Sequence, residues 1–257
     1  MKIGIVLHPY SEKTPAGLGG YIFNLTKALI EEDTENEYIV FLKEKSSHIP
    51  EIAGTNWKVY ILGFGFLWRD LGFFFAPKVD VCIFNTPILP ILYKHKKTIA
   101  IALDFAYWHL GARTLKEKAT RYALFFYNKV SLARADTVVA ISNATKKDVV
   151  ELFNVPEQKI HTIYPGYRDI SALPEERIDV STNAPFFLFA GVIKRRKNVF
   201  NIVKAFITFK QKYNTSYKLI ISGGGGGEYL GRIKKMISHE NMNDEIIFTG
   251  YVDDGQL

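Results

Sequence analysis

Four consecutive cations, Lys194 to Lys197, are the residues of this sequence whose type and spacing most directly indicate chemistry. They follow an apolar run and stand where a segment with helical spacing of apolar residues begins. A helix N-terminus already carries about half a positive charge, so cations are disfavoured there unless an anion binds beside them. A diphosphate would justify at least two of the four cations. A solvated charged turn is the alternative.

Glycine-rich segments follow two of the predicted strands. The run ISGGGGGEYLGR places Gly223 and Gly224 after the strand that comes next to the cations, and TPAGLGGYIFNL (14–25) places Gly19 and Gly20 after the first strand. Glycines at such positions let a backbone and a helix N-terminus approach an anion, whereas the alternative is a flexible turn. Neither run matches G-x-G-x-x-G, and no G-x-x-x-x-G-K-[ST] occurs, which argues against dinucleotide oxidoreductases and P-loop nucleotide hydrolases.

A carboxylate, Asp104, ends the predicted strand TIAIALD, and Tyr107 and His109 follow shortly after it. At the carboxyl end of a parallel strand, Asp104 can face a ligand, since ligands of open α/β sheets bind at that edge. It can equally cap a helix or accept backbone N–H groups, and both readings stay open. For His109 alone, a surface or packing role is the commoner one.

The elements that must position these residues alternate between strand and helix. Ten apolar runs predict strands, and three segments with apolar residues at helical spacing predict helices at 19–32, 143–153 and 198–212, the second capped by Ser142. Most of the runs are continuously apolar, as in parallel strands covered on both faces. The predicted fold class is therefore α/β with doubly wound, Rossmann-type sheets. The predicted strands are 3–8, 38–43, 58–62, 80–85, 98–104, 137–142, 159–164, 186–191, 218–223 and 245–250.

A polar, proline-flanked segment at 168–185 separates seven predicted strands from three. It predicts an N-terminal domain over 1–167, a linker, and a second domain over 186–257. Three strands are few for a doubly wound sheet. Asp253 and Asp254 are typical N-cap residues and predict the start of a helix, but the sequence ends before that helix. We therefore expect the second domain to be incomplete and the chain to be C-terminally truncated.

Composition limits the partners and the compartment. The 257 residues carry a formal net charge of +7, which favours anionic partners without choosing among nucleic acid, phosphorylated ligands and membranes. The single cysteine, Cys82, lies in an apolar run, which predicts a buried small side chain and a reducing compartment. No Cys and His residues have metal-ligand spacing.

Membrane insertion is not predicted. The N-terminus has too short an apolar run for a signal peptide. Arg69 and Asp70 interrupt the most apolar stretch, ILGFGFLWRDLGFFFAP (61–77), so it does not predict a membrane-spanning helix. Its aromatic residues could contact a membrane surface, although core packing is the favoured interpretation. We expect a cytoplasmic protein, with peripheral contact at the inner face of the membrane as an option.

The segment ARADTVVAISNATKKDVVELFNVPEQKIHTIYPG (133–166) resembles the middle of family 4 glycosyltransferases, which have the GT-B fold. FAGVIKRRKN, LIISGGGGG and IIFTGYVDDGQL resemble consecutive donor-domain segments of that family, and the match runs in order over essentially the whole chain. The resemblance implies an acceptor-binding N-terminal domain and a C-terminal domain that binds a nucleotide-diphosphate sugar. It implies sugar transfer with retention of anomeric configuration, no cofactor and no metal.

The resemblance also implies roles for particular residues. The donor site would consist of Gly19 and Gly20 near a phosphate, Arg196 and Lys197 on the leaving diphosphate, Gly223 and Gly224 beside the donor, and Tyr251 and Val252 near the nucleobase. Asp104 would be catalytic, and Tyr107 and His109 would contact the acceptor.

Three departures from the family pattern stand out. Leu103 precedes Asp104 where many relatives have His, and Val192 follows a glycine where many have Arg, a role that Arg196 can take. The paired glutamates of the pattern Glu-x7-Glu, which bind sugar and ribose in the family, are absent, so the chain by itself is expected to be inactive.

The sequence thus predicts a glycosyltransferase that acts on a glycan or lipid-linked acceptor in cell-surface polysaccharide or lipopolysaccharide synthesis, with no nucleic-acid partner. A sugar-nucleotide epimerase of the same fold and a non-catalytic protein that binds sugar nucleotide or glycan remain the alternatives. The sugar, nucleobase and linkage are left open.

Overall fold

The computed structural model describes residues 1–8, 18–45, 51–111, 114–167 and 184–252. The chain divides into two compact units, Met1–Gly166 and Tyr167–Leu257, and each is described by itself. Most of the expected linker and the helix start expected at Asp253 and Asp254 lie outside the described residues.

Unit 1 is built on seven parallel strands in the order β3-β2-β1-β4-β5-β6-β7. Strand β1 pairs with β2 on one side and with β4 on the other, so the strand order reverses there. Ligands of open α/β sheets bind at the carboxyl ends of the strands beside such a reversal. The strands are β1 (Lys2–Val6), β2 (Glu37–Leu42), β3 (Trp57–Ile61), β4 (Val81–Phe84), β5 (Thr98–Ala102), β6 (Thr137–Ala140) and β7 (Ile160–Thr162).

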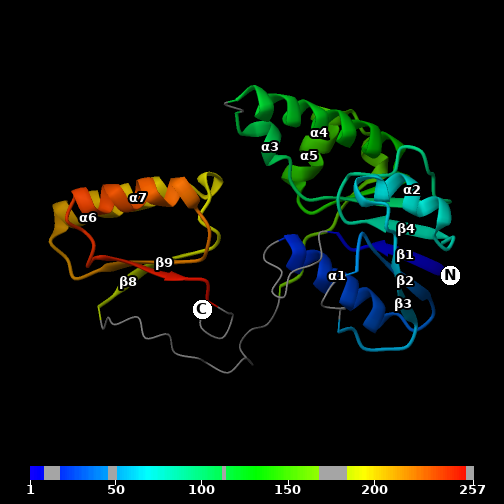
Figure 1. Cartoon of the computed structure of the whole chain (residues 1–257), viewed down its shortest axis with the longest axis horizontal. Helices are drawn as coiled ribbons and strands as arrows, with labels where there is room; N and C mark the ends of the chain where they lie inside the picture. Colours follow the sequence, from blue (N-terminus) through cyan, green and yellow to red (C-terminus); the bar gives the residue numbers. More distant parts are fainter. Residues whose placement is uncertain (9–17, 46–50, 112–113, 168–183, 253–257) are drawn as a thin grey trace. The chain divides into compact units, whose positions relative to one another are not determined.

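Helices cover both faces of this sheet (Figure 1). Ile22 and Ile30 of α1 pack in one core cluster with the strand residue Val40, whereas Phe73 of α2 and Leu132 of α4 pack in the cluster on the other face. Cys82 is fully buried in that second cluster, as predicted. The helical elements are α1 (Leu18–Glu32), η1 (Gly65–Leu67), α2 (Trp68–Phe75), α3 (Ala106–His109), α4 (Leu115–Arg134), α5 (Asn143–Phe153) and η2 (Glu157–Lys159).

Two helices of unit 1 begin at side-chain caps. The hydroxyl of Ser142 accepts a hydrogen bond from the amide of Thr145, which confirms the cap predicted for α5. Thr114 and Glu117 form a capping box at the start of α4, a helix that the apolar spacing did not predict. Each cap satisfies backbone donors that the first turn leaves without partners.

The aromatic stretch 61–77 is only half explained by core packing. Trp68 and Phe73 are buried, but Phe66 and Phe75 are 90% and 71% exposed. The core interpretation therefore holds for one side of α2 and is wrong for the other.

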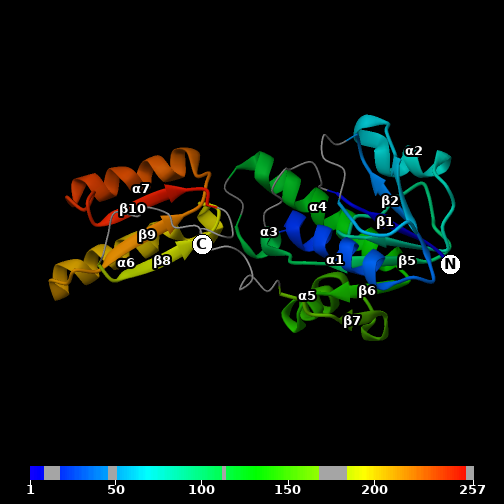
Figure 2. The same cartoon turned by 90° about the horizontal axis from the view of Figure 1, so that it is seen from below.

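Unit 2 has three parallel strands in the order β10-β9-β8, whose arrowheads point the same way in Figure 2. Val203 and Phe206 of α6 and Ile233 of α7 form its core with strand β9. The expectation of two α/β units with Rossmann-type parallel sheets, the second with fewer strands, is confirmed. The elements are β8 (Phe186–Ala190), η3 (Arg195–Lys197), α6 (Val199–Tyr213), β9 (Lys218–Ser222), α7 (Gly227–His239) and β10 (Ile246–Gly250).

Candidate functional site

The carboxyl edge of the unit 2 sheet is tied together by backbone hydrogen bonds. The amide of Gly191, after β8, donates to Ser222 at 2.9 Å, and the amide of Ile193 donates to Gly224 at 3.0 Å. The amide of Gly223 donates to Gly250, the last residue of β10, at 2.6 Å. The turn that carries the cations and the glycine run therefore lie side by side, as expected from the parallel strands.

The two glycines predicted to border the donor have different surroundings. Gly223 has a φ of 137°, and a side chain on it would collide with the backbone of Gly191. Gly224 has no atom within 4 Å of the position that a Cβ would take. Gly223 thus has a packing reason to be glycine, whereas Gly224 faces open space where a ligand could approach.

The four cations form an exposed turn at this edge. Arg195–Lys197 are one turn of 3₁₀ helix, closed by a hydrogen bond from the amide of Lys197 to the carbonyl of Lys194. All four side chains are exposed, so burial does not set Lys197 apart from Lys194. Among the residues that the structure describes, no carboxylate forms an ion pair with Lys194, Arg195 or Lys197. Lys194, Arg195 and Lys197 therefore present positive charge that no described carboxylate compensates.

Two helices begin beside this turn. Asn198 adopts a left-handed conformation with a φ of 56° and ends the turn, and α6 starts at Val199. The amide of Phe200 in the first turn of α6 already donates to the hydroxyl of Tyr229 at 2.9 Å. The start of α7 has no side-chain cap. Since unsatisfied N–H groups at a helix start attract anions, α7 is the better placed of the two helices to receive a phosphate.

Tyr251 and Val252 directly follow β10 at the same edge of the sheet. Tyr251 is 62% exposed and Val252 is half-buried. They follow Gly250, which accepts the amide of Gly223, so they come directly after the strand end that contacts the glycine run.

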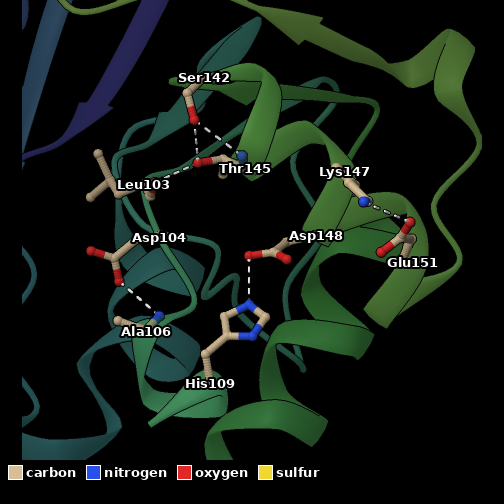
Figure 3. Close-up of polar contacts among 9 residues, drawn as sticks. All are labelled: Leu103, Asp104, Ala106, His109, Ser142, Thr145, Lys147, Asp148 and Glu151. Atoms are coloured by element: carbon tan, nitrogen blue, oxygen red, sulfur yellow. Dashed lines mark hydrogen bonds and ion pairs between the residues drawn. The ribbon is translucent and has the colours of Figure 1, made fainter.

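At the carboxyl edge of the unit 1 sheet, Asp104 follows β5 and its side chain is exposed (Figure 3). Its Oδ1 atom accepts a hydrogen bond from the amide of Ala106 at 3.1 Å. The preceding residue, Leu103, accepts from the hydroxyl of Thr145 through its carbonyl oxygen at 2.9 Å, which ties β5 to the start of α5. Asp104 therefore stabilises the local turn and still presents a carboxylate to solvent.

His109 has a partner that sequence spacing did not suggest. Its Nε2 atom lies 2.9 Å from the Oδ2 atom of Asp148, which stands on α5 (Figure 3). The His109 side chain is 55% exposed, so the imidazole is held from one side and open on the other. Asp148 is 39 residues away in sequence and inside a predicted helix, where no pattern marked it.

Tyr107 contacts a different part of unit 1 from His109. Its hydroxyl accepts a hydrogen bond from the side-chain amide of the buried residue Asn128 at 2.7 Å. Burial raises the pKa of the Tyr107 phenol, and the Asn128 bond partly opposes this. Tyr107 lines a cavity of about 440 Å³ between α3 and α4, to which the arginine Arg121 also contributes. The two residues predicted to contact the acceptor thus lie on the same short helix but face different neighbours.

Gly19 and Gly20 lie in the first turn of α1 rather than in a loop, since the helix begins at Leu18. Gly19 is buried and Gly20 is half-buried. The expectation of a glycine loop before the helix therefore falls on residues that the structure does not describe, while the two glycines themselves are helical.

His8, at the carboxyl end of β1, also lies near the strand reversal. Its ring lies 4.9 Å from that of Trp68. Burial, together with Arg69 and Lys43, lowers the pKa of His8 to about 4, so this imidazole is neutral at pH 7. Its place at the end of the first predicted strand was the signal that could have marked it.

The two units, each a parallel sheet with helices and each with polar residues or glycines at the carboxyl edge, define the GT-B class of glycosyltransferase fold. Residues 15–169 match the family described as Glycosyltransferase Family 4, and residues 174–257 match Glycosyl transferases group 1. The chain belongs to glycosyltransferase family 4.

Individual relatives agree with this assignment. The glycosyltransferase MJ1069 of Methanocaldococcus jannaschii is 28% identical over 98% of this chain and 70% of its own length. The serotype-specific mannosyltransferase WbdA of Escherichia coli is 24% identical over 71% of this chain and 21% of its own length. The crystal structure of HepE from Anabaena, in complex with UDP and glucose, has a TM-score of 0.66 at 16% identity and covers 99% of this chain and 70% of that one. The structural similarity to HepE shows that the two proteins share a fold.

Within the described residues, no helix is both long and apolar enough to cross a bilayer.

Proposed function

We propose that the protein transfers a sugar, with retention, from a nucleotide-diphosphate sugar to a glycan or lipid-linked acceptor in cell-surface polysaccharide or lipopolysaccharide synthesis. The observation that carries the proposal is the edge of unit 2, where an exposed cationic turn lies beside the open backbone of Gly224 and the uncapped start of α7. Each of these features favours a phosphate. HepE, which shares the fold, was solved with UDP and glucose, and WbdA is a mannosyltransferase.

In the proposed reaction, Arg196 and Lys197 stabilise the negative charge that develops on the leaving diphosphate. Because two side-chain cations would meet this charge, we propose that the transfer requires no metal ion. Gly19, Gly20, Gly223, Gly224, Tyr251 and Val252 complete the donor contacts in this proposal.

Asp104, Tyr107 and His109 serve the acceptor side of the proposed reaction. The exposed carboxylate of Asp104 would be the catalytic group, and the half-exposed imidazole of His109, held by Asp148, would contact an acceptor hydroxyl. This end of unit 1 presents a carboxylate that accepts the amide of Ala106 and an imidazole that contacts Asp148.

Because the 257-residue chain by itself is expected to be inactive, the experiment uses the protein with the paired-glutamate segment of the family present. It supplies this protein with radiolabelled UDP-glucose, GDP-mannose or UDP-galactose and a lipid-linked oligosaccharide fraction, with and without EDTA. The proposal expects label in the acceptor fraction from one donor, with the anomeric configuration of that donor and with equal yield in EDTA. Conversion of the sugar nucleotide without acceptor would instead indicate an epimerase. Donor binding with no turnover under any condition would indicate a non-catalytic binding protein.

We also propose that unit 1 contacts an anionic membrane surface. An aromatic patch formed by Phe64, Phe66, Phe74 and Phe75 is exposed on η1 and α2, with Phe64 and Phe75 stacked at 5.5 Å. Contiguous exposed apolar side chains of this size commonly mark an interaction surface. Asp70 accepts the amides of Ile91 and Leu92 at 2.6 and 2.8 Å and so holds these further exposed apolar side chains beside α2.

Positive charge adjoins the aromatic patch. Phe74 packs edge-to-face on Tyr93 at 5.5 Å. Tyr93 lines a cavity of about 470 Å³ with four lysines and one aspartate, of which Lys96 and Asp80 form an ion pair at 2.9 Å, so the lysines remain in excess. Apolar side chains beside lysines suit the interface of an anionic bilayer, where each lysine near the surface adds about 1 kcal/mol.

Sedimentation with vesicles tests this contact. The wild-type protein should bind phosphatidylglycerol-containing vesicles and bind phosphatidylcholine vesicles more weakly. Phe66→Ser combined with Phe75→Ser should reduce binding at least about thirtyfold, since about 2 kcal/mol accompanies each buried aromatic side chain and about 1.4 kcal/mol is a factor of ten. The control is Phe186→Ser, a phenylalanine in unit 2 that is 51% exposed. No difference between the two lipids, or an equal loss in the control, would contradict the contact.

A further inference from the structure

We infer that the cavity between α3 and α4 binds an anionic group, a phosphate or a carboxylate, on the acceptor sugar. The inference rests on the proposed function and specifies the chemistry of its acceptor. The cavity has a volume of about 440 Å³, which is within the range of pockets for small ligands. Its walls come from Tyr107, Leu110, Gly111, Thr114, Lys116, Glu117, Thr120, Arg121 and Leu124.

Arg121 is the residue of this cavity that most directly indicates an anion. Aromatic rings, and not a carboxylate, hold its guanidinium in place. Its guanidinium carbon lies 4.5 Å from the centre of the Trp108 ring and 5.6 Å from that of Tyr122. Trp108 in turn stacks on Phe125 at 4.2 Å. The aromatic stack fixes the plane of the guanidinium, so its N–H groups keep one direction, which favours planar recognition of an oxyanion.

The hydrogen-bonding state of Arg121 also indicates a missing anion. Its Nε atom is buried and has no hydrogen-bond partner. In the part of the chain that the structure describes, no carboxylate forms an ion pair with Arg121. Buried N–H donors of native proteins are almost always paired, so an unpaired one on a cavity wall points to a ligand acceptor.

The charges around the cavity favour an anion as well. Lys116 and Arg121 contribute two positive charges, and Glu117 contributes one negative charge. The Glu117 carboxylate accepts a hydrogen bond from the amide of Thr114 in the capping box at the start of α4, so it is engaged with the helix. The free positive charge therefore exceeds the negative charge on the wall.

Two further groups suit the sugar that would carry this anion. Tyr107 offers an aromatic face and a hydroxyl held by Asn128 at 2.7 Å, and Thr120 offers a second hydroxyl on the wall. Hydroxyl groups and one aromatic face are common contacts of a bound sugar, whereas the guanidinium fork matches a phosphate or carboxylate in two-point geometry.

The test uses the 257-residue chain labelled with 5-fluorotryptophan, because Trp108 lies directly against Arg121. The fluorine signal of Trp108 is followed during titration with glucose, glucose 6-phosphate and glucuronate, with Trp57 and Trp68 as internal references. Glucose 6-phosphate or glucuronate should bind at least about tenfold more tightly than glucose, as expected of a charge-assisted hydrogen bond. If glucose 6-phosphate binds more tightly than glucuronate, the bound group is a phosphate. If glucuronate binds more tightly, the bound group is a carboxylate.

Variants on α4 separate a defined site from a generally basic helix. Arg121→Gln should weaken binding of the anionic sugar about tenfold or more, and Lys116→Gln about threefold. Lys118→Gln, which changes the same charge on α4 at a residue outside the cavity wall, should change it by less than about twofold. Unchanged melting temperatures show that the variants fold.

Equal affinity for glucose and for both anions, or an Arg121→Gln variant that binds like the wild type, would overturn the inference. An equal loss in Lys118→Gln would also overturn it, because the effect would then be one of net charge. Calorimetric titration with UDP and GDP measures nucleotide binding by unit 2, separately from sugar binding at the cavity. Failure there would contradict the proposed function without changing the signal of Trp108.

Discussion

Gly223 lies so close to Gly191 that a Cβ atom on Gly223 would be 2.0 Å from the carbonyl oxygen of Gly191. The backbone of Gly223 also has a φ of 137°, which side chains rarely tolerate. We therefore expect Gly223→Ala to lower the free energy of unfolding of unit 2 by about 2–4 kcal/mol, from backbone strain and displacement of the turn after β8. Denaturant unfolding followed by far-ultraviolet circular dichroism, which reports on backbone structure, measures this loss. Wild-type stability of the variant would contradict the close approach.

Gly224→Ala is the matched variant one residue further on. A Cβ atom there meets no other atom within 4 Å, so the stability of unit 2 should change by less than about 0.5 kcal/mol. The added methyl group would project into the space proposed for the donor, so affinity for UDP or GDP should fall. Calorimetric titration measures this. Unchanged affinity would mean that the donor does not approach Gly224.

In the protein with the paired-glutamate segment of the family present, Asp104→Asn should reduce sugar transfer strongly and leave the melting temperature nearly unchanged. The carboxylate is exposed, and an asparagine oxygen can still accept the hydrogen bond from the amide of Ala106. The substitution therefore removes charge while it keeps the turn. A melting temperature lowered by many degrees would show that Asp104 is mainly a structural acceptor.

Stability should fall between about pH 6.5 and pH 4 because of buried histidines. Burial lowers the pKa of His95 from 6.5 to about 4, and the pKa of His8 is lowered to the same region. In this window the unfolded chain binds protons that the folded protein does not, so the free energy of unfolding decreases as the pH falls. At 1.36 kcal/mol per pKa unit, the buried His95 would contribute about 2 kcal/mol between pH 6.5 and 5.

His95→Phe should remove most of this contribution, because the ring of His95 packs on Phe73 at 4.6 Å and on Tyr93 at 4.8 Å, contacts that a phenylalanine can keep. The control is His239→Gln, whose side chain is 85% exposed in the wild type. Denaturant midpoints at pH 7 and pH 5 measure both. If His95→Phe loses as much stability on acidification as the wild type, the buried neutral imidazole is not the cause.

The strands were predictable because they are continuous apolar runs. The run DVCIF, for example, contains β4, with Cys82 and Phe84 buried in the core. Helices α2, α4 and α7 were missed for two reasons. Helix α2 is only eight residues long and is also aromatic on its exposed side, and much of α4 is exposed, so neither shows a clear helical spacing of apolar residues. Helix α7 begins within the glycine run at Gly227, and glycine is a poor helix former.

The candidate site was predictable only where it follows the order of strands. The proximity of the cations to Gly224 follows from two parallel strands that end at one edge, and the structure bears it out through the bond from Ile193. The pairing of His109 with Asp148 joins residues far apart in sequence, and the stacking of Arg121 on Trp108 depends on how α3 packs against α4. Such contacts arise from tertiary packing, which a single sequence does not display.

The central claim, that the cationic turn of unit 2 binds a diphosphate, is tested most directly by replacing its cations one at a time. Each alanine variant keeps the turn, because the bond that closes it joins the backbone amide of Lys197 to the carbonyl of Lys194. Lys197 stands at the end of the turn next to α6, whereas Lys194 begins it. A hydrogen bond to a charged group contributes about 1.5–3 kcal/mol, and about 1.4 kcal/mol is a factor of ten in affinity.

The measurement is calorimetric titration of the wild type and the four single-alanine variants with UDP and GDP. We expect Lys197→Ala to weaken binding of the preferred nucleotide by about ten- to a hundredfold, and Lys194→Ala by no more than about twofold. Equal small losses at all four positions would show a diffuse basic surface and contradict a diphosphate site.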